Sequence, residues 1–433
     1  MMMKQKFLAF GMACLLFSGT SYAQQNPKVF KGATIHTVAG NPIENGVLIV
    51  QNGKITAVGG AQTTIPANAE VIDVSGKVIL PGLVDTHTHL GEGSGGDGSS
   101  ALNPDVRIYD GIDARSDGFN RALAGGITSV NAMPGSGHLM SGQTVYLKMR
   151  EARTIDDLLL TNREGVFGGM KMANGTNPVR NMGPFPGTRA KSAAMARDLF
   201  VKAQEYKAKV EKAGGDAAKM PERSLQMEAV VEILDRKRIV HFHTHRHDDI
   251  MTALRLSQEF NFRIVLHHVS EAWKVAEEIA KAGAHASIIY LDSPGGKLEA
   301  VDLRPTNGRE LEKYGANVAF HTDDGISDSR FFIRQAAFSV KEGMSKKAAI
   351  EALTIAGARM MDLDDRIGSL ENGKDADFII LSGDPFSVYT RVEQTWVEGL
   401  KRFDLANPED KTWATGGYDV YRSIMHIHHH LEN

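Results

Sequence analysis

Cysteine is almost absent from this 433-residue chain, which contains a single one, Cys14. That residue lies inside an N-terminal apolar segment that we expect to be cleaved off. The mature protein would then have no thiol, which excludes a cysteine nucleophile, a disulfide framework and a cysteine-ligated zinc site. Any metal ion would have to be held by histidine, carboxylate or modified lysine side chains.

The N-terminal segment has the features of a secretory signal peptide. Lys4 and Lys6 precede an apolar run over 7–17, which is too short to span a bilayer, and Ala23 ends a stretch of the kind that signal peptidase reads. We therefore expect residues 1–23 to be removed and the protein to be exported, either periplasmic or secreted. No membrane association is expected after cleavage.

The chain also has no large excess of positive or negative charge. The formal net charge is −3, and no long run of like charges occurs. This balance argues against a nucleic-acid partner and favours a small-molecule substrate. Association into a homo-oligomer stays open. The chain is 42% hydrophobic, and its length allows one large core and a smaller domain.

Strand and helix patterns divide the chain into a central and two outer parts. The central part alternates apolar strand-like stretches with helical ones, of which 192–212 and 224–238 are the clearest. Buried parallel strands with crossover helices indicate a doubly wound sheet or a closed barrel. Seven or eight units over roughly 280 residues favour the barrel. The expected barrel strands are Leu83–His89, Ile127–Ala132, Gly165–Met172, Ile239–His243, Arg263–His268, Ala286–Leu291 and Asn317–His321.

The outer parts are strand-like and contain Asn52-Gly53, a strong hairpin signal. The prediction is an α/β fold in which residues 81–365 form a (β/α)8 TIM-like barrel. A small composite β-sandwich domain is expected from 24–80 together with 366–433.

Two histidines follow the first predicted barrel strand. His87 and His89 are two residues apart, so strand geometry points both side chains the same way. At a barrel mouth, two converging imidazoles would supply two nitrogen ligands to one divalent metal. Lys171 ends another apolar strand. It is either a substrate-binding or surface lysine, or a carbamylated lysine whose carboxylate-like group bridges two metals.

Histidines crowd the strand in the segment IVHFHTHRHDD. His241, His243, His245 and His247 are predicted to share one face, but residues two apart are separated by ~6.8 Å along a strand. One or two of them can therefore reach a given metal, and the others contact substrate or pack.

Two more strand ends carry possible ligands. In IVLHHV, His267 and His268 are expected to point to opposite faces. In VAFHTDDG, His321 and Asp323 are expected to share a face, and Asp324 to point away. A carboxylate such as Asp323 can bind metal and accept a proton from water.

Three stretches resemble the amidohydrolase superfamily, in particular its imidazolonepropionase-like and metal-dependent dipeptidase (prolidase-like) branch. They are LPGLVDTHTHL, AGGITSV and ALTIAGARMMDLDDRIGSLENGKDADFIIL. The resemblance covers nearly the whole mature chain and implies two divalent metal ions, usually zinc. The implied metal ligands are His87, His89, Lys171, His243, His268 and Asp323, with Lys171 carbamylated, Asp323 catalytic and His267 turned away.

Two loops resemble substrate-side loops of one subgroup. His138 lies in PGSGHLMSGQ and Arg180 in NGTNPVR. We expect His138, Arg180, His245 and His321 to contact substrate. The cluster His426–His430 is expected to be a solvated tail.

The predicted function is hydrolysis of a C–N amide bond in a dipeptide or cyclic amide by metal-activated water. A deaminase on the same barrel would use one metal and would not need Lys171. A lactonase, esterase or phosphotriesterase would share the two-metal site. A non-catalytic binding protein that kept the barrel is the alternative of another class, and the full set of candidate ligands argues against it.

Overall fold

The computed structural model describes residues 26–91, 96–181, 183–290 and 297–417. The predicted signal peptide and the cluster His426–His430 lie outside these ranges and stay predictions. Within them, no helix is both long enough and apolar enough to cross a membrane.

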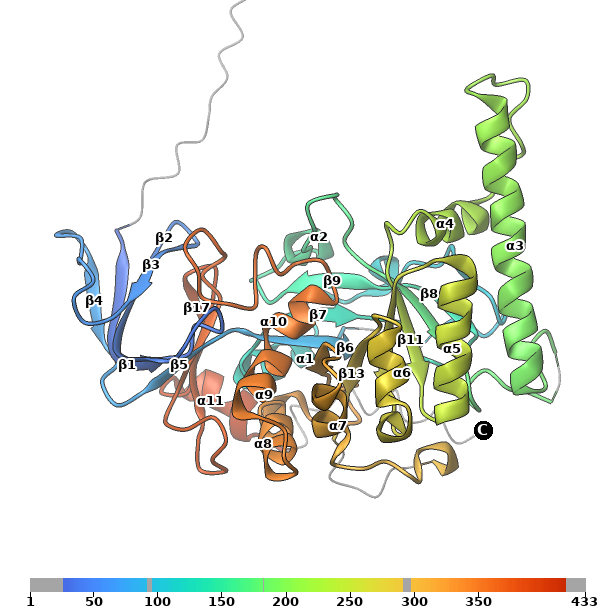
Figure 1. Cartoon of the computed structure of the whole chain (residues 1–433). Helices are drawn as coiled ribbons and strands as arrows, with labels where there is room; N and C mark the ends of the chain where they lie inside the picture. Colours follow the sequence, from blue (N-terminus) through green and yellow to red (C-terminus); the bar gives the residue numbers. More distant parts are fainter. Residues whose placement is uncertain (1–25, 92–95, 182, 291–296, 418–433) are drawn as a thin grey trace, which may run out of the picture.

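One eight-stranded sheet combines strands from both ends of the chain (Figure 1). Its order is β17-β16-β15-β5-β1-β2-β3, and β4 pairs with β1. The strands are β1 Lys28–Ile35, β2 Ile43–Gln51, β3 Lys54–Gly59, β4 Glu70–Asp73, β5 Val78–Pro81, β15 Phe378–Leu381, β16 Val392–Val397 and β17 Leu400–Asp404. The two ends of the chain meet where β5 runs antiparallel to β15.

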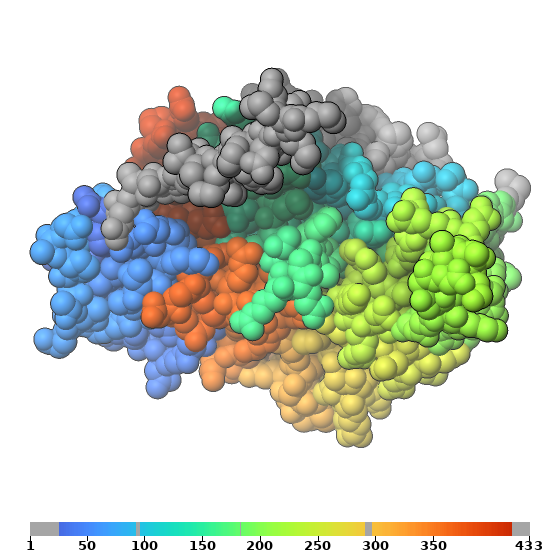
Figure 2. Space-filling model, turned by 90° about the horizontal axis from the view of Figure 1, so that it is seen from above, coloured from blue at the N-terminus to red at the C-terminus, as the bar shows by residue number. Residues whose placement is uncertain are grey.

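Local sequence explains the turn and the core of this sheet. Asn52 and Gly53 both have positive φ, 51° and 77°, as the tight turn between β2 and β3 requires. Phe30 lies edge-on to Phe378 and Trp396, with ring centroids 4.8 and 4.9 Å away. In Figure 2 the blue N-terminal strands adjoin orange residues from late in the chain. The predicted β-sandwich and its boundaries stay predictions.

The central part of the chain forms two further sheets, of six and three strands. The six-stranded order is β14-β13-β12-β11-β10-β8, and the three-stranded order is β6-β7-β9. Their bounds are β6 Leu83–Thr88, β7 Ile127–Ala132, β8 Met140–Gln143, β9 Val145–Lys148, β10 Met170–Ala173, β11 Val240–Thr244, β12 Ile264–His268, β13 His285–Ile288 and β14 Val318–Phe320. Neighbouring strands from β10 to β14 are parallel, as are β6 and β7.

The edges of these two sheets adjoin. Only Thr144 separates β8 from β9 along the chain. At the other edge, the backbone N–H of Asp323 donates to the carbonyl of His87 at 2.9 Å. The described strands thus form two open sheets side by side, without a closed ladder.

Helices connect the parallel strands. The α-helices are α1 Asp117–Ala124, α2 Ile155–Leu158, α3 Arg189–Ala213, α4 Leu225–Leu234, α5 His247–Phe260, α6 Ala276–Lys281, α7 Asn307–Lys313, α8 Arg334–Lys341, α9 Lys346–Leu353, α10 Ile355–Arg359 and α11 Pro408–Thr415. Short 3₁₀ helices cover Ile108–Gly111, Ala272–Lys274, Leu298–Ala300 and Ser329–Phe331. Because crossover connections keep the strands parallel, their carboxyl ends meet on one side of the sheet.

The predicted helices 192–212 and 224–238 correspond to α3 and α4. The Thr188 side chain caps α3 by accepting from the backbone N–H of Lys191, and Gly214 ends the helix in the left-handed conformation. Figure 1 shows α3 projecting from the body of the molecule.

Candidate active site

Imidazole rings gather at the carboxyl ends of the parallel strands. The ring of His87, on β6, lies 5.0 Å from His267, 5.1 Å from His268 and 5.0 Å from His321, measured between centroids. His243, on β11, lies 4.2 Å from His268. All five side chains are buried. Strands that are far apart in the sequence therefore place nitrogen donors in one small volume.

The carboxylate of Asp323 lies among these rings. Its Oδ1 is 3.0 Å from Nε2 of His89 and 3.3 Å from Nε2 of His87, and its Oδ2 is 4.0 Å from Nε2 of His268. Burial alone would raise the pKa of Asp323, but the hydrogen bond with His89 and the surrounding positive charges lower it to about 2. The carboxylate is therefore ionised at neutral pH.

Three rings are oriented through their Nδ1 atoms. Nδ1 of His89 contacts the Met133 carbonyl at 2.8 Å, Nδ1 of His245 contacts Ser270 Oγ at 2.7 Å, and Nδ1 of His268 contacts His321 Nε2 at 3.2 Å. Metal-ligating histidines commonly use the second nitrogen in this way. Among the described residues, the buried Nε2 atoms of His245 and His268 have no hydrogen-bond partner. Such nitrogens fit a bound cation.

Three overlapping sets of donor atoms have the spacing of a metal site, with all atoms of a set within 4.8 Å of one another. The sets are His87, His267 and His321; His243, His245 and His268; and His87, His268 and Asp323. Burial is the largest cause that lowers the pKa of each histidine, to about 3 for His241 and His321 and well below the usual value for His87, His243, His245, His267 and His268. The imidazoles are therefore neutral at pH 7, which is the form that binds metal.

Lys171, on β10, is fully buried beside these donors. Its Nζ is 3.0 Å from Nε2 of His87 and 3.0 Å from Sδ of Met133. The positive charge of Lys171 contributes to the lowered pKa of His87 and His241. The structure thus places the predicted bridging residue at the predicted pair of histidines.

The expectation that His267 points away is wrong. Its ring lies 5.0 Å from His87 and 5.4 Å from His321, and its Nε2 is 2.9 Å from Nδ1 of His241. His267 is the residue that regular strand alternation directs inward. His268 joins it because its backbone has φ +70°, which ends the alternation at the last residue of β12.

The four histidines of β11 and the following turn do not share one strand face. The strand ends at Thr244, so only His241 and His243 belong to it. His245 follows the strand but still reaches the donors. His247 is the first residue of α5, and its Nδ1 is 2.6 Å from Oε2 of Glu271. His247 therefore belongs to a helix start.

The two predicted substrate loops contact each other. Arg180 donates to the carbonyl of Gly137 at 3.0 Å, and the amide of Asn177 donates to Ser136 Oγ at 3.0 Å. Nδ2 of Asn177 also lies 3.0 Å from Nε2 of His243, so these loops border the donors. His138 is buried, and its ring is 5.6 Å from that of Phe185.

Sequence reasoning missed Asp85, which ties β6 to the segment after β14. Its Oδ2 accepts from Thr322 Oγ1 at 2.5 Å, and its Oδ1 accepts from the backbone N–H groups of Thr322 and His87. Burial raises the pKa of Asp85 to about 7, against the effect of these hydrogen bonds. Its position two residues before His87 was a usable signal, because strand periodicity puts both on one face.

Lys297 and Asn177 were also missed. Lys297 Nζ lies 2.7 Å from Oδ1 of Asn177 and 3.2 Å from Nε2 of His243. The sequence carries no signal for Lys297, because it lies in a loop and belongs to no motif.

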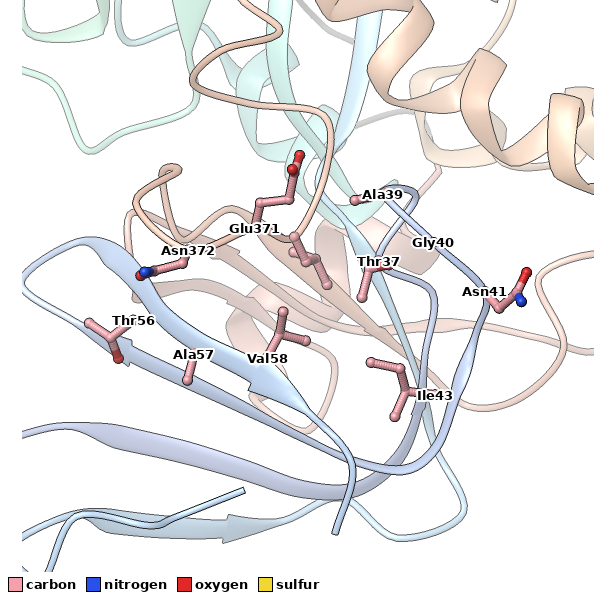
Figure 3. Close-up of a pocket in the computed structure, with 11 residues that line it drawn as sticks. Thr37, Ala39, Gly40, Asn41, Ile43, Thr56, Ala57, Val58, Glu371 and Asn372 are labelled. Atoms are coloured by element: carbon pink, nitrogen blue, oxygen red, sulfur yellow. The ribbon is translucent and has the colours of Figure 1, made fainter. Parts of the chain in front are cut away.

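A separate pocket of about 730 Å³ lies at the sheet formed by the chain ends (Figure 3). Thr37, Thr56, Val58, Glu371 and Asn372 are among its lining residues. Glu371 is the one titratable side chain in this lining. None of the described residues that line this pocket belongs to the three donor sets.

Neutral imidazoles and an ionised carboxylate at the carboxyl ends of parallel strands form a set of donors that could hold a divalent metal ion. The sequence model described as the amidohydrolase family matches residues 78–408, and the chain belongs to this family. The family that the sequence resembles is thereby confirmed.

Individual relatives agree with this assignment. The chain is 26% identical to the amidohydrolase tasK of Hapsidospora irregularis over 83% of its own length, but it spans only 40% of that relative. It is 24% identical to an imidazolonepropionase of Alkaliphilus metalliredigens, over 78% of this chain and 84% of the relative. The crystal structure of an amidohydrolase from Thermotoga maritima matches with a TM-score of 0.80 and 32% identity, over 87% of this chain and all of that one. Solved amidohydrolases imply a TIM-like barrel for the central sheets.

Proposed function

We propose that this protein is a two-metal hydrolase that cleaves the C–N amide bond of a dipeptide or a cyclic amide. The observation that carries the proposal is the position of Asp323, whose carboxylate oxygens face Nε2 atoms of His87, His89 and His268. The carboxylate that would act as general base and several neutral imidazole nitrogens therefore lie close together.

The donors would divide between two metal positions that share one bridging residue. His87, His89 and Asp323 would hold one ion, and His243 and His268 the other. Lys171 would bridge the two as a carbamate, which forms when its neutral amine adds to CO2 and releases a proton. Zinc is our candidate for both ions, because its usual ligands include histidine nitrogen and carboxylate oxygen.

Divalent ions at such a site lower the pKa of water to about 7 and polarise a carbonyl oxygen. Asp323 is ionised and accepts the proton of the attacking water, then delivers it to the leaving amine. His245 and His321 face the same volume and would contact the substrate. Arg180 and His138 would contribute through the loops that border His243.

A screen of the zinc-loaded protein tests this proposal. The panel contains dipeptides, cyclic amides, a lactone, a phosphotriester and aminopurines, and the Asp323→Asn variant is the control. The expected result is amino-acid release from a dipeptide or ring opening of a cyclic amide, lost in the control. Turnover of the lactone or phosphotriester alone, or ammonia release from the aminopurines alone, would contradict it.

A further inference from the structure

Lys297 reaches the candidate metal donors from a loop that precedes the short 3₁₀ helix Leu298–Ala300. Its Nζ lies 2.7 Å from Oδ1 of Asn177, 3.2 Å from Oε1 of Glu299 and 3.2 Å from Nε2 of His243. The side chain is 37% exposed, so the ammonium group lies between the buried donors and solvent.

The surroundings of Lys297 hold this ammonium group in place. Glu299 is buried, accepts from the backbone N–H of Thr176 at 2.7 Å, and lies 3.6 Å from the guanidinium of Arg189. Asn177 is fixed in turn through Ser136. The ammonium group of Lys297 thus donates to Oδ1 of Asn177 and forms an ion pair with Glu299.

Nζ of Lys297 also lies 3.2 Å from Nε2 of His243. A metal ion on that nitrogen would take its lone pair, so the N–H group directed at it would need another acceptor. A substrate bound beside His243 can supply one. An ammonium group prefers an anionic acceptor, because charge-assisted hydrogen bonds are about twice as strong as neutral ones.

We propose that Lys297 binds the C-terminal carboxylate of the substrate, which makes the preferred substrates small peptides with a free C-terminus. This inference rests on the proposed function. In a dipeptide the carboxylate carbon is three bonds from the scissile carbonyl carbon, so a cation that adjoins a metal ligand lies within reach of it. Lys297 would then select substrates by their charge and leave the hydrolytic step to other residues.

The test compares the best dipeptide from the screen with the same dipeptide as its C-terminal amide. Lys297→Met removes the charge and keeps much of the side-chain volume. Lys281→Met is the matched control, because Lys281 of α6 is 72% exposed and pairs with Glu277 on the same helix. Metal content and the calorimetric affinity for the released C-terminal amino acid provide readouts independent of turnover.

Lys297→Met should lower kcat/KM for the dipeptide by about 10- to 100-fold, mainly through KM, and leave the amide little changed. Affinity for the amino acid should fall in parallel, with metal content unchanged, and Lys281→Met should behave as wild type. Equal losses for dipeptide and amide, or unchanged amino-acid affinity, would overturn the inference. A wild-type enzyme that cleaves dipeptides without preferring the free carboxylate overturns this inference alone, whereas one that cleaves no dipeptide contradicts the peptide substrate on which it rests.

Discussion

The proposed role of Asp323 places two requirements on its side chain. It must stay ionised although it is largely buried, and it must keep an oxygen close to several possible metal ligands. The hydrogen bond with His89 and the charges of His89, His321 and Lys171 lower its pKa, and the contacts to His89 and His87 fix its position. Its neighbour Asp324 points elsewhere, toward Arg121 at 3.4 Å and the backbone N–H of Ser329 at 3.1 Å.

Replacing Asp323 by Asn should therefore abolish most activity without emptying the site. The amide keeps one metal-binding oxygen but cannot take up a proton, and loss of a general base typically costs about 100- to 10,000-fold in kcat. Kinetics and metal analysis measure both effects. Asp324→Asn weakens a buried ion pair and should lower stability more than kcat. Equal kinetic losses in the two variants would place the proton shuttle elsewhere, with His321 the next candidate.

At this scale, spacing predicted one pair of donors, and the resemblance to the family implied the other candidate ligands. His87 and His89 were expected to converge, and their Nε2 atoms lie 3.3 and 3.0 Å from the same oxygen of Asp323. Asp85 could have been found by the same periodicity. Lys297 could not have been found in this way, because its role depends on a contact to Asn177, more than a hundred positions away along the chain.

Strand β12 shows where periodicity fails at the scale of an element. Alternation predicts one inward histidine out of His267 and His268, whereas both lie among the donors because His268 and Val269 have positive φ. Tertiary contacts determine whether the last residue of a strand adopts the left-handed conformation. The period-two pattern of the sequence does not indicate it. Asp323, with φ +50°, is a similar case after β14.

Strand β11 allows a direct test of which histidine lies at the right depth. His243 lies beside Asn177, His241 lies one pleat repeat earlier on the strand beside His267, and His247 belongs to α5. Replacing His243 by Ala should remove at least one metal ion, as measured by elemental analysis. His241→Ala and His247→Ala should retain more metal. If only His245→Ala removes the metal, the ligand is His245, one pleat repeat further along the chain than His243.

On the scale of the whole molecule, buried ion pairs join the C-terminal segment to the central sheets. Lys148, at the end of β9, is fully buried and pairs with Asp375 and, at 2.9 Å, with Asp377. Lys54 of β3 reaches the other oxygen of Asp375 at 2.5 Å but is 49% exposed. The sequence predicted that the chain ends pair, but not these ions, because their partners are far apart along the chain.

The two lysines form a matched pair for measuring stability. Lys148→Met removes the buried ammonium group that pairs with both Asp375 and Asp377, although Asp375 keeps Lys54 and Arg366, and should cost about 3–5 kcal/mol in free energy of unfolding. Lys54→Met removes a partly exposed partner of the same carboxylate and should cost about 0–1 kcal/mol. Urea unfolding measures both values. Similar values for the two variants would show that burial of the Lys148 ion pairs does not determine how strongly they stabilise the contact between the C-terminal segment and the central sheets.

The number of metal ions per chain tests the proposed function of the whole molecule most directly. Elemental analysis of the purified mature protein should give close to two divalent ions. Lys171→Ala should lose at least one of them, because the bridge between the two positions is gone, and a short carboxylic acid with added metal should restore part of the loss. A wild-type content of one ion that is unchanged in Lys171→Ala would contradict the two-metal site and favour a deaminase-like enzyme.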